Sequence, residues 1–247
     1  MAKALLLALP VISATATAAD HEICEPKAYE MALRYQQKSA EIMALQLQTY
    51  RFATERFNEK IKGLTAPENY AVVMDLDETV LDNTPLLARD AEQCHDYTKW
   101  DTWSDWEKQG KPGLIPGAKA FLDRVNQSKV RIYYVSDRMQ ENKADTLNTL
   151  KSLGLPQVSE DSVLLDTVSK EARRQSILKK QQIIMLFGDS LPDFAAQFKN
   201  KKPSEAQREL VEASADRFGS DWIVLPNAAY GSWSKATLEG WKAPLKQ

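Results

Sequence analysis

The segment from residue 72 to residue 79 reads Val-Val-Met-Asp-Leu-Asp-Glu-Thr, and it decides the fold. The apolar run predicts a buried strand that ends in two aspartates, Asp75 and Asp77, with Thr79 two positions further on. Residues i and i+2 face the same side of an extended backbone, so both carboxylates leave the strand end together. Like charges held this close raise each other's pKa. The pair therefore indicates a bound cation, or one carboxylate that attacks while the other carries a proton.

A second acidic strand end lies far downstream. Residues 183–187 form a continuous apolar run, which is typical of a strand buried on both faces. Gly188 follows and permits close approach of the backbone, and then come Asp189 and Asp193, the latter in a helix expected over 192–198. Four carboxylates at two strand ends are suitable ligands for a hard cation such as Mg²⁺. A solvated loop would explain either strand end alone, but hardly both.

Two further polar residues complete the candidate site. Residues 130–135 read as a third buried strand that ends in Ser136, whose hydroxyl could hold a phosphate oxygen together with nearby backbone N–H groups. Lys170 opens a predicted helix upstream of residues 183–187 and could neutralise a carboxylate and a phosphoryl oxygen together. Taken singly, Ser136 also reads as a helix cap and Lys170 as a surface cation.

The order of the predicted elements indicates an α/β fold. Helices alternate with five predicted strands, at residues 70–74, 130–135, 163–165, 183–187 and 222–225. Such alternation is typical of a parallel sheet covered by helices on both faces. Ligands bind such sheets at the carboxyl ends of the strands, which is where the aspartates fall.

Two regions fall outside this alternation and predict a smaller, mainly helical cap. Residues 27–62 contain no Gly or Pro and predict one long helix or two, packed on the core or, alternatively, contributing to a homodimer contact. Residues 86–113 are rich in aromatic and charged side chains. We expect residues 19–66 to form part of the cap, and residues 67–247 to form the core with the insertion at about 86–113 completing the cap.

The order of the motifs resembles the haloacid dehalogenase (HAD) superfamily of phosphohydrolases, in which D-x-D-x-T, Ser, Lys and G-D-x-x-x-D each follow a strand. Finer detail resembles the class C nonspecific acid phosphatases, a group that includes bacterial surface lipoproteins with 5′-nucleotidase activity. The resemblance runs from about residue 25 to about residue 241. It rests on residues 75–83, Trp100-x-x-Trp103, Pro116-Gly117-Ala118, Lys170-x-x-Arg173 and residues 226–233.

The resemblance implies a HAD-like Rossmannoid core and a two-step phosphatase mechanism. Asp75 would attack the phosphorus of a phosphate monoester and form an aspartyl-phosphate. Asp77 would protonate the leaving oxygen and then take a proton from the attacking water, which implies an acidic pH optimum. Ser136 and Lys170 would hold the other phosphoryl oxygens.

The same resemblance implies a cofactor and a surface for the leaving group. Mg²⁺ would be held by Asp75, the backbone carbonyl of Asp77, Asp189 and, directly or through water, Asp193. Trp100 and Tyr230 would form the face on which a nucleobase or another aromatic leaving group stacks. Alternatively, Trp100 and Tyr230 are ordinary aromatic residues of the hydrophobic core.

The sequence departs from the family pattern at two positions. The surface lipoproteins carry a lipobox cysteine, but Cys24 follows His-Glu-Ile, which lacks the small apolar residues of a lipobox. The family usually has Asn after the Ser or Thr of the second motif, where this chain has Asp137. A carboxylate at that position would repel phosphate unless Arg138 or Lys170 offsets its charge.

The N-terminal residues predict export. Residues 1–18 combine Lys3, an apolar stretch and an Ala-Thr-Ala cleavage site, which is the pattern of a secretory signal peptide. The mature chain would begin near Ala19 and be periplasmic or secreted. In an oxidising compartment the two cysteines, Cys24 and Cys94, either form a disulfide or remain free thiols.

Composition limits the remaining function classes. A net charge of −2 with no basic stripe argues against binding a nucleic-acid polymer, and no segment is long and apolar enough for a membrane span. Trp100 stands where a Cys-x5-Arg phosphatase would need Arg after Cys94, and there is no Arg-His-Gly motif of a histidine phosphatase. The sequence leaves open a phosphotransferase that uses an alcohol in place of water. It also leaves open an exported binding protein that has lost turnover.

Overall fold

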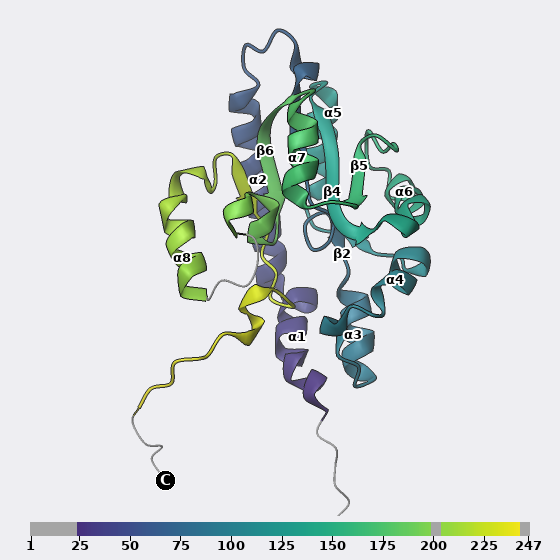
Figure 1. Ribbon diagram of the computed structural model, residues 1–247, viewed down its shortest axis with the longest axis vertical. Coiled ribbons are helices and arrows are strands. Elements are labelled where there is room, and N and C mark those ends of the chain that lie inside the picture. Colours follow the sequence, from purple (N-terminus) through teal and green to yellow (C-terminus); the bar gives the residue numbers. More distant parts are fainter. Residues whose placement is uncertain (1–23, 199–203, 243–247) are drawn as a thin grey trace, which may run out of the picture.

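The computed structural model describes residues 24–198 and 204–242, and a five-stranded parallel sheet lies at its centre (Figure 1). The strand order is β5-β4-β1-β6-β7, so β1 lies in the middle. The strands are β1 (Tyr70–Met74), β4 (Arg131–Met139), β5 (Val163–Asp166), β6 (Gln182–Gly188) and β7 (Trp222–Val224). The predicted α/β fold with a parallel sheet is confirmed. The predicted leader at residues 1–18 lies outside the described residues.

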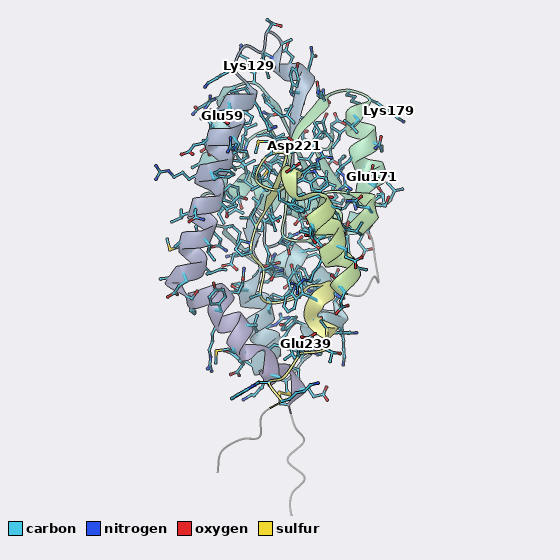
Figure 2. The ribbon with its side chains drawn as sticks, turned by 90° about the vertical axis from the view of Figure 1, so that its left-hand side faces the viewer. Glu59, Lys129, Glu171, Lys179, Asp221 and Glu239 are labelled. Carbon is cyan, nitrogen blue, oxygen red and sulfur yellow. A yellow bond between two sulfur atoms is a disulfide. The ribbon has the colours of Figure 1, made fainter. Side chains whose placement is uncertain are left out.

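Helices cover both faces of this sheet, because alternate residues of each buried strand point to opposite sides. On β1, Val72 and Met74 pack against one helical layer, while Ala71 and Val73 pack against the other. The first layer consists of α2 (Ala40–Lys60), α5 (Ala118–Gln127) and α6 (Lys143–Ser152). The second consists of α7 (Lys170–Leu178) and α8 (Ser204–Ala213). Figure 2 shows α2, near Glu59, on one side of the molecule and α7, near Glu171 and Lys179, on the other.

A separate group of helices lies beyond the carboxyl ends of the strands, at the lower end of Figure 1. It contains α1 (Glu30–Lys38), α3 (Thr84–Glu92) and α4 (Trp103–Gln109), and the short antiparallel pair β2 (Leu81–Asp82) and β3 (Gly113–Leu114) connects α3 and α4 to the core. Its interior is a hydrophobic cluster of its own, which we call the aromatic cluster. The buried members are Leu33, Leu86, Leu87, Ala91, Tyr97, Trp103 and Ala229.

The predicted N-terminal helical region is two helices. Ser39 separates α1 from α2, and its hydroxyl accepts a hydrogen bond from Ile42 N at 3.1 Å, which is the usual way to begin a helix. The break allows α1 to join the aromatic cluster while Tyr50 and Phe57 of α2 pack against the sheet. Among residues 24–198 and 204–242, no helix is both long and apolar enough to cross a membrane.

The structure corrects two predicted boundaries. The third strand does not end before Ser136, because β4 continues to Met139, where it pairs with Asp166 after a shift in register. The helix predicted over 192–198 is instead two 3₁₀ turns, η5 (Leu191–Asp193) and η6 (Ala196–Phe198). In η5 the Asp193 carboxylate turns back to accept a hydrogen bond from Ser190 N, which fixes a tight turn.

Further 3₁₀ turns connect the main elements. They are η1 (Glu25–Tyr29), η2 (Pro67–Asn69), η3 (Tyr97–Lys99), η4 (Gln140–Asn142), η7 (Ala215–Arg217) and η8 (Ser232–Lys235).

Cys24 and Cys94 form a disulfide, with their Cα atoms 5.5 Å apart. The bond joins the start of η1 to the turn that follows α3, so it links two segments that contribute to the aromatic cluster. The two residues are 70 positions apart, and in the chain-entropy model a loop of this length stabilises the fold by about 4 kcal/mol. Of the two states that the sequence left open for these cysteines, the structure has the disulfide.

Candidate active site

Three carboxylates meet at the carboxyl edge of the sheet. Asp75 follows β1 and Asp189 follows β6, and the two strand ends are joined by a hydrogen bond from Asp75 N to Phe187 O at 3.0 Å. Asp193 approaches closely because Gly188 has no side chain; a Cβ atom there would collide with the Asp193 carboxylate. One oxygen from each of Asp75, Asp189 and Asp193 lies within 4.8 Å of the others. The fold therefore brings together in one carboxylate cluster three of the four carboxylates that were predicted at the two strand ends, and the side chain of Asp77 is not one of them.

Lys170 is the cation of this cluster. It is the first residue of α7, and its Nζ donates hydrogen bonds to Asp75 Oδ1 and to Asp193 Oδ1, both at 2.6 Å. Burial alone would lower the pKa of Lys170, but Asp193 and Asp75 raise that pKa well above its ordinary value. Lys170 therefore stays charged beside Asp75.

The cluster nevertheless has an excess of negative charge. Burial raises the pKa of Asp75 to about 7; Lys170 opposes this shift, while Asp193 and Asp77 add to it. Burial, with Asp75 and Asp193, also raises the pKa of Asp189 well above its usual range. Lys170 alone does not balance the negative charge of three ionised carboxylates. Their oxygen atoms are therefore suitable ligands for a divalent cation that prefers oxygen.

Asp193 and Asp189 differ in how much of their hydrogen-bonding capacity is already used. Both oxygens of Asp193 are engaged, one by Lys170 and the other by Ser190 N at 3.0 Å. Asp189 accepts a hydrogen bond from Asn227 Nδ2 at 2.8 Å on Oδ2, and its Oδ1 has no hydrogen-bond partner among the described residues. Asp189 is therefore more available for direct metal coordination than Asp193, whose position favours binding through water.

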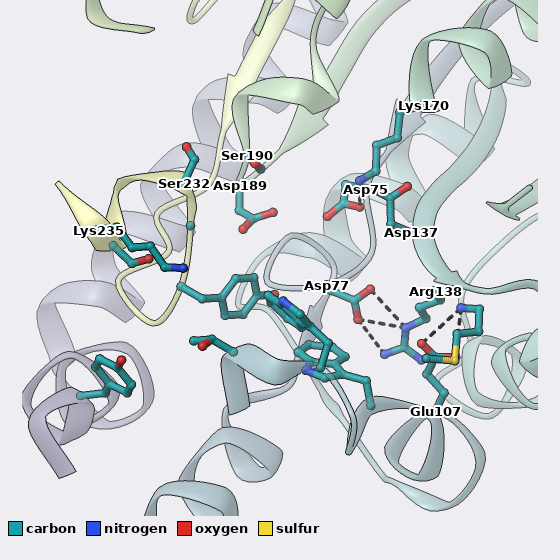
Figure 3. Close-up of a pocket in the computed structure, with 18 residues that line it drawn as sticks. Asp75, Asp77, Glu107, Asp137, Arg138, Lys170, Asp189, Ser190, Ser232 and Lys235 are labelled. Atoms are coloured by element: carbon teal, nitrogen blue, oxygen red, sulfur yellow. Dashed lines mark hydrogen bonds and ion pairs between the residues drawn. The ribbon is translucent and has the colours of Figure 1, made fainter. Parts of the chain in front are cut away.

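Asp77 lies in a different environment from Asp75. Its Oδ1 accepts hydrogen bonds from Arg138 Nε at 2.9 Å and Nη2 at 2.8 Å (Figure 3). Its Oδ2 accepts a hydrogen bond from Ser136 Oγ at 2.9 Å. Burial alone would raise the pKa of Asp77, but the Arg138 guanidinium and its hydrogen bonds outweigh burial and hold that pKa below its usual value. Asp77 is therefore held as a carboxylate.

Ser136 is placed differently from the sequence expectation. It lies inside β4, is fully buried, and is absent from the residues that line the cavity described below. Its hydroxyl donates to Asp77, whereas the neighbouring residues Asp137 and Arg138 reach the cavity. The structure thus places Ser136 beneath Asp77. The spacing of Ser136 and Arg138, two residues apart on one strand, was the signal in the sequence that both could reach the same partner.

The charge of Asp137 is offset directly by Arg173, a cation that the sequence analysis did not consider for this role beside Arg138 and Lys170. Arg173 Nη2 donates a hydrogen bond to Asp137 Oδ1, and Nη1 donates to Ser136 O at 2.6 Å. Arg138 is committed to Asp77, and Lys170 to the carboxylate cluster. Because Arg173 lies one helical turn after Lys170 on α7, one helix supplies both cations.

Glu78 is a buried residue of the site that sequence reasoning missed. It has a positive φ of 56° in the loop after β1, which turns its side chain inward. Its carboxylate accepts hydrogen bonds from Asn83 N at 2.9 Å and from the Tyr230 hydroxyl. Burial raises the pKa of Glu78 to about 8, and nearby Asp77 adds to the shift. Its place within the Asp-Leu-Asp-Glu-Thr segment was its signal in the sequence.

A cavity of about 570 Å³ opens above these groups (Figure 3). Asp75, Asp77, Lys170 and Asp189 lie on its charged side. Aromatic side chains form another part of its wall, namely Tyr29, Trp100, Trp103 and Tyr230. The cavity therefore combines charged groups with aromatic surface that is suited to a ring.

Trp100 and Tyr230 both reach the cavity, but they do not form one flat surface. Their ring centroids are 5.1 Å apart and their planes are at 88°, so only one of them can lie face to face with a given ligand ring. Trp100 remains 44% exposed, while the Tyr230 hydroxyl is bound to Glu78. Trp100 is thus the more available ring for stacking.

Comparison with known proteins agrees with this geometry. The family model of HAD superfamily subfamily IIIB, described as acid phosphatase, matches residues 7–233. The fold is similar to a structure of the class C acid phosphatase from Bacillus anthracis, with 31% sequence identity and a TM-score of 0.79. The similarity covers 85% of this chain and 88% of that one. A structure of the Bacillus anthracis enzyme with tungstate bound gives the same values.

Proposed function

The chain belongs to the acid phosphatases of HAD subfamily IIIB, which are phosphomonoester hydrolases, and from this premise we propose how it works and on what. We propose that it is an exported, Mg²⁺-dependent acid phosphatase that acts through an aspartyl-phosphate and accepts nucleoside 5′-monophosphates. The observation that carries the proposal is Asp75, held by Lys170 within a carboxylate cluster and facing a cavity with an aromatic wall.

Asp75 acts as the nucleophile in this proposal. Its carboxylate attacks the phosphorus, the bond from phosphorus to the leaving oxygen breaks, and an acyl-phosphate forms on Asp75. Lys170 contacts Asp75 directly, so it orients the carboxylate and can also donate a hydrogen bond to a phosphoryl oxygen. Ser136 contributes by fixing Asp77, with no role at the phosphate required of it.

Asp77 acts as the acid and then as the base. Arg138 and Ser136 hold it as a carboxylate, which is the form that takes a proton from the attacking water in the second step. To protonate the leaving oxygen in the first step, Asp77 must first gain a proton. Lower pH raises that protonated fraction against the effect of Arg138, which is the reason to expect an acidic optimum.

The residues of the cluster fit a magnesium ion. Asp75, Asp189 and the backbone carbonyl of Asp77 would supply oxygen ligands, with Asp193 binding through water. A bound Mg²⁺ would offset the negative charge of the phosphoryl group and of the carboxylates as an anionic nucleophile approaches.

The packing supports a smaller cap than the one expected from the sequence, which included residues 19–66. We assign η1, α1 and residues 86–113 to the cap, since η1, α1, α3, η3 and α4 share the aromatic cluster. We assign α2 to the core, since Tyr50, Ala53 and Phe57 pack against the sheet. On this division the cap supplies Tyr29, Trp100 and Trp103 to the wall of the cavity, and so it contacts the leaving group.

A substrate panel tests the proposed specificity. Hydrolysis of nucleoside 5′-monophosphates, sugar phosphates and aryl phosphates would be measured at several pH values, each with and without a chelator. We expect kcat/KM to be higher for phosphates with an aromatic ring next to the scissile group, and activity to require the cation. A panel with equal kcat/KM for ring-bearing and small aliphatic phosphates would contradict the nucleotide preference.

Trp100→Ala is expected to reduce kcat/KM for a nucleoside monophosphate by about 5- to 150-fold, because stacking on an aromatic side chain is worth roughly 1–3 kcal/mol per base. The loss for a small sugar phosphate should be much smaller, since that substrate offers no ring. Trp100→Phe is the matched control: it keeps an aromatic face at the same positive φ and should recover most of the activity. Equal losses on both substrates would assign Trp100 to cap packing. Tyr230→Ala is less informative, because it also removes the hydrogen bond to Glu78.

Export is supported by the disulfide, because such bonds persist in oxidising compartments. The bond also consumes the Cys24 thiol, which leaves none for attachment of a lipid. We expect mass analysis of the N-terminus to find a chain that starts near Ala19, recovered from the periplasm or the medium. An unprocessed chain in the cytoplasm, or a lipid on Cys24, would contradict this expectation.

A further inference from the structure

The loop that follows β7, residues 226–230, is bonded to parts of the chain that lie far apart in sequence. Gln36 of α1 donates a hydrogen bond from Nε2 to Pro226 O and accepts one at Oε1 from Ala228 N, both at 3.0 Å. The Tyr97 hydroxyl, from η3, donates to Ala229 O at 2.7 Å. Because Gln36 and Tyr97 are buried, these bonds are shielded from water and hold the loop firmly on the cap.

Asn227 connects this anchored loop to the carboxylate cluster. Its Oδ1 accepts hydrogen bonds from Ala229 N at 2.8 Å and Tyr230 N at 3.4 Å, so the carbonyl end of the amide is fixed by the loop itself. Its Nδ2 consequently points the other way and donates to Asp189 Oδ2 at 2.8 Å. The reverse orientation of the amide would set its Nδ2 donor against the N–H groups of Ala229 and Tyr230, and its oxygen against the Asp189 carboxylate. The donor is therefore directed to Asp189.

The hydrogen bond from Asn227 occupies only one of the two carboxylate oxygens of Asp189. Oδ2 accepts the hydrogen bond from Asn227, while Oδ1 has no hydrogen-bond partner among the described residues. Asp189 belongs to the cluster in which one oxygen of each carboxylate lies within 4.8 Å of the others. Figure 3 shows Asp189 directed into the cavity, with Asp75 across from it. Asn227 thus restrains the rotation of a carboxylate that stands on a loop and would otherwise turn.

We propose that Asn227 is a positioning residue for the divalent cation, holding Asp189 so that its second oxygen coordinates the ion. The proposal rests on the metal site proposed above and adds the residue that orients its ligand. Groups that hydrogen-bond a metal ligand orient it, and losing one typically lowers metal affinity by about 10- to 100-fold. The restraint comes from the Asn227 amide, which Ala229 N and Tyr230 N hold within the loop, so the 226–230 loop contributes to the cation site without supplying a ligand.

The experiment is titration of the full-length chain with MgCl₂ by calorimetry, in the absence of substrate, with thermal unfolding measured in parallel. Asn227→Ala should raise the Kd for Mg²⁺ by about 10- to 100-fold. Asn227→Ser is a second variant: a serine hydroxyl can still accept a hydrogen bond from the loop but is too short to reach Asp189, so it should show a comparable loss while preserving the loop. Gln36→Ala is the control, since it loosens the same loop without touching Asp189, and its Kd should stay near the wild-type value.

The outcomes separate this inference from the proposed function. Wild-type affinity in both Asn227 variants would overturn the positioning role, and so would an equal loss in Gln36→Ala, because the loop alone would then explain the effect. Failure of the wild-type chain itself to bind Mg²⁺ would overturn the proposed metal site, and the inference with it. A raised Kd in the Asn227 variants alone, with saturating Mg²⁺ restoring kcat, is the result that the hydrogen bond to Asp189 predicts.

Discussion

Asp75→Asn is expected to lower kcat by about 10³-fold or more, because removing the nucleophile from a group of catalytic residues removes nearly all of their combined effect. A neutral amide cannot form the acyl-phosphate. The fold should persist, since the change keeps the size of the side chain and removes a carboxylate whose pKa is already raised by burial. Lys170 keeps its other partner, Asp193. The measurement is turnover of an aryl phosphate with and without added Mg²⁺, alongside thermal unfolding.

Asp137→Asn is the matched control for this change. Asp137 also lines the cavity at the carboxyl edge of the sheet, but it is bound to Arg173 and is not part of the carboxylate cluster. Most of the activity should remain in this variant. If Asp75→Asn kept more than a few per cent of the wild-type rate while remaining folded, Asp75 would not be the nucleophile.

Chelation should stop activity, and Mg²⁺ should restore it. Asp189→Asn should raise the Mg²⁺ concentration needed for half-maximal activity by roughly 100-fold or more, because an anionic ligand is lost from a hard-cation site. This effect should exceed the one that follows when a metal ligand only loses a hydrogen-bond partner. The change is large because Asp189 has an oxygen that no described residue occupies.

The matched comparison is Asp193→Asn, which should change the Mg²⁺ requirement less, since both Asp193 oxygens are already engaged by Lys170 and Ser190 N. Activity would be measured against Mg²⁺ concentration after complete removal of metal. Full activity in excess chelator would remove the metal from the mechanism, and an equal response of the two variants would refute the assignment of Asp189 as the direct ligand.

The sequence predicted the sheet and the meeting of its acidic strand ends for a simple physical reason. Parallel strands place their carboxyl ends at one edge, so residues that follow β1 and β6 must lie close together. Lys170 could be placed beside them because it begins the helix that leads into β6. The family resemblance is confirmed, and with it the hydrolysis of phosphate monoesters.

The pairing of charged side chains across the site was not predictable from local patterns. Arg138 meets Asp77 only because β4 continues past Ser136, which depends on its register with β5. Arg173 meets Asp137 from α7, and Asn227 meets Asp189 from a loop that the cap anchors. Each of these contacts joins segments that only tertiary packing brings together. The sequence shows that Ser136 and Arg138 share a face of the strand, but its periodicity does not identify the partner that they meet.

The most direct test of the mechanism is to trap the covalent intermediate. The enzyme would be mixed with a phosphate monoester, quenched in acid within a single turnover, digested and examined by mass spectrometry, with borohydride reduction to mark an acyl-phosphate. The result expected is one phosphoryl group on the peptide that contains Asp75, conversion of that residue to homoserine by borohydride, and neither product in Asp75→Asn. A phosphoryl group on another residue, or turnover with no covalent intermediate at Asp75, would contradict the mechanism.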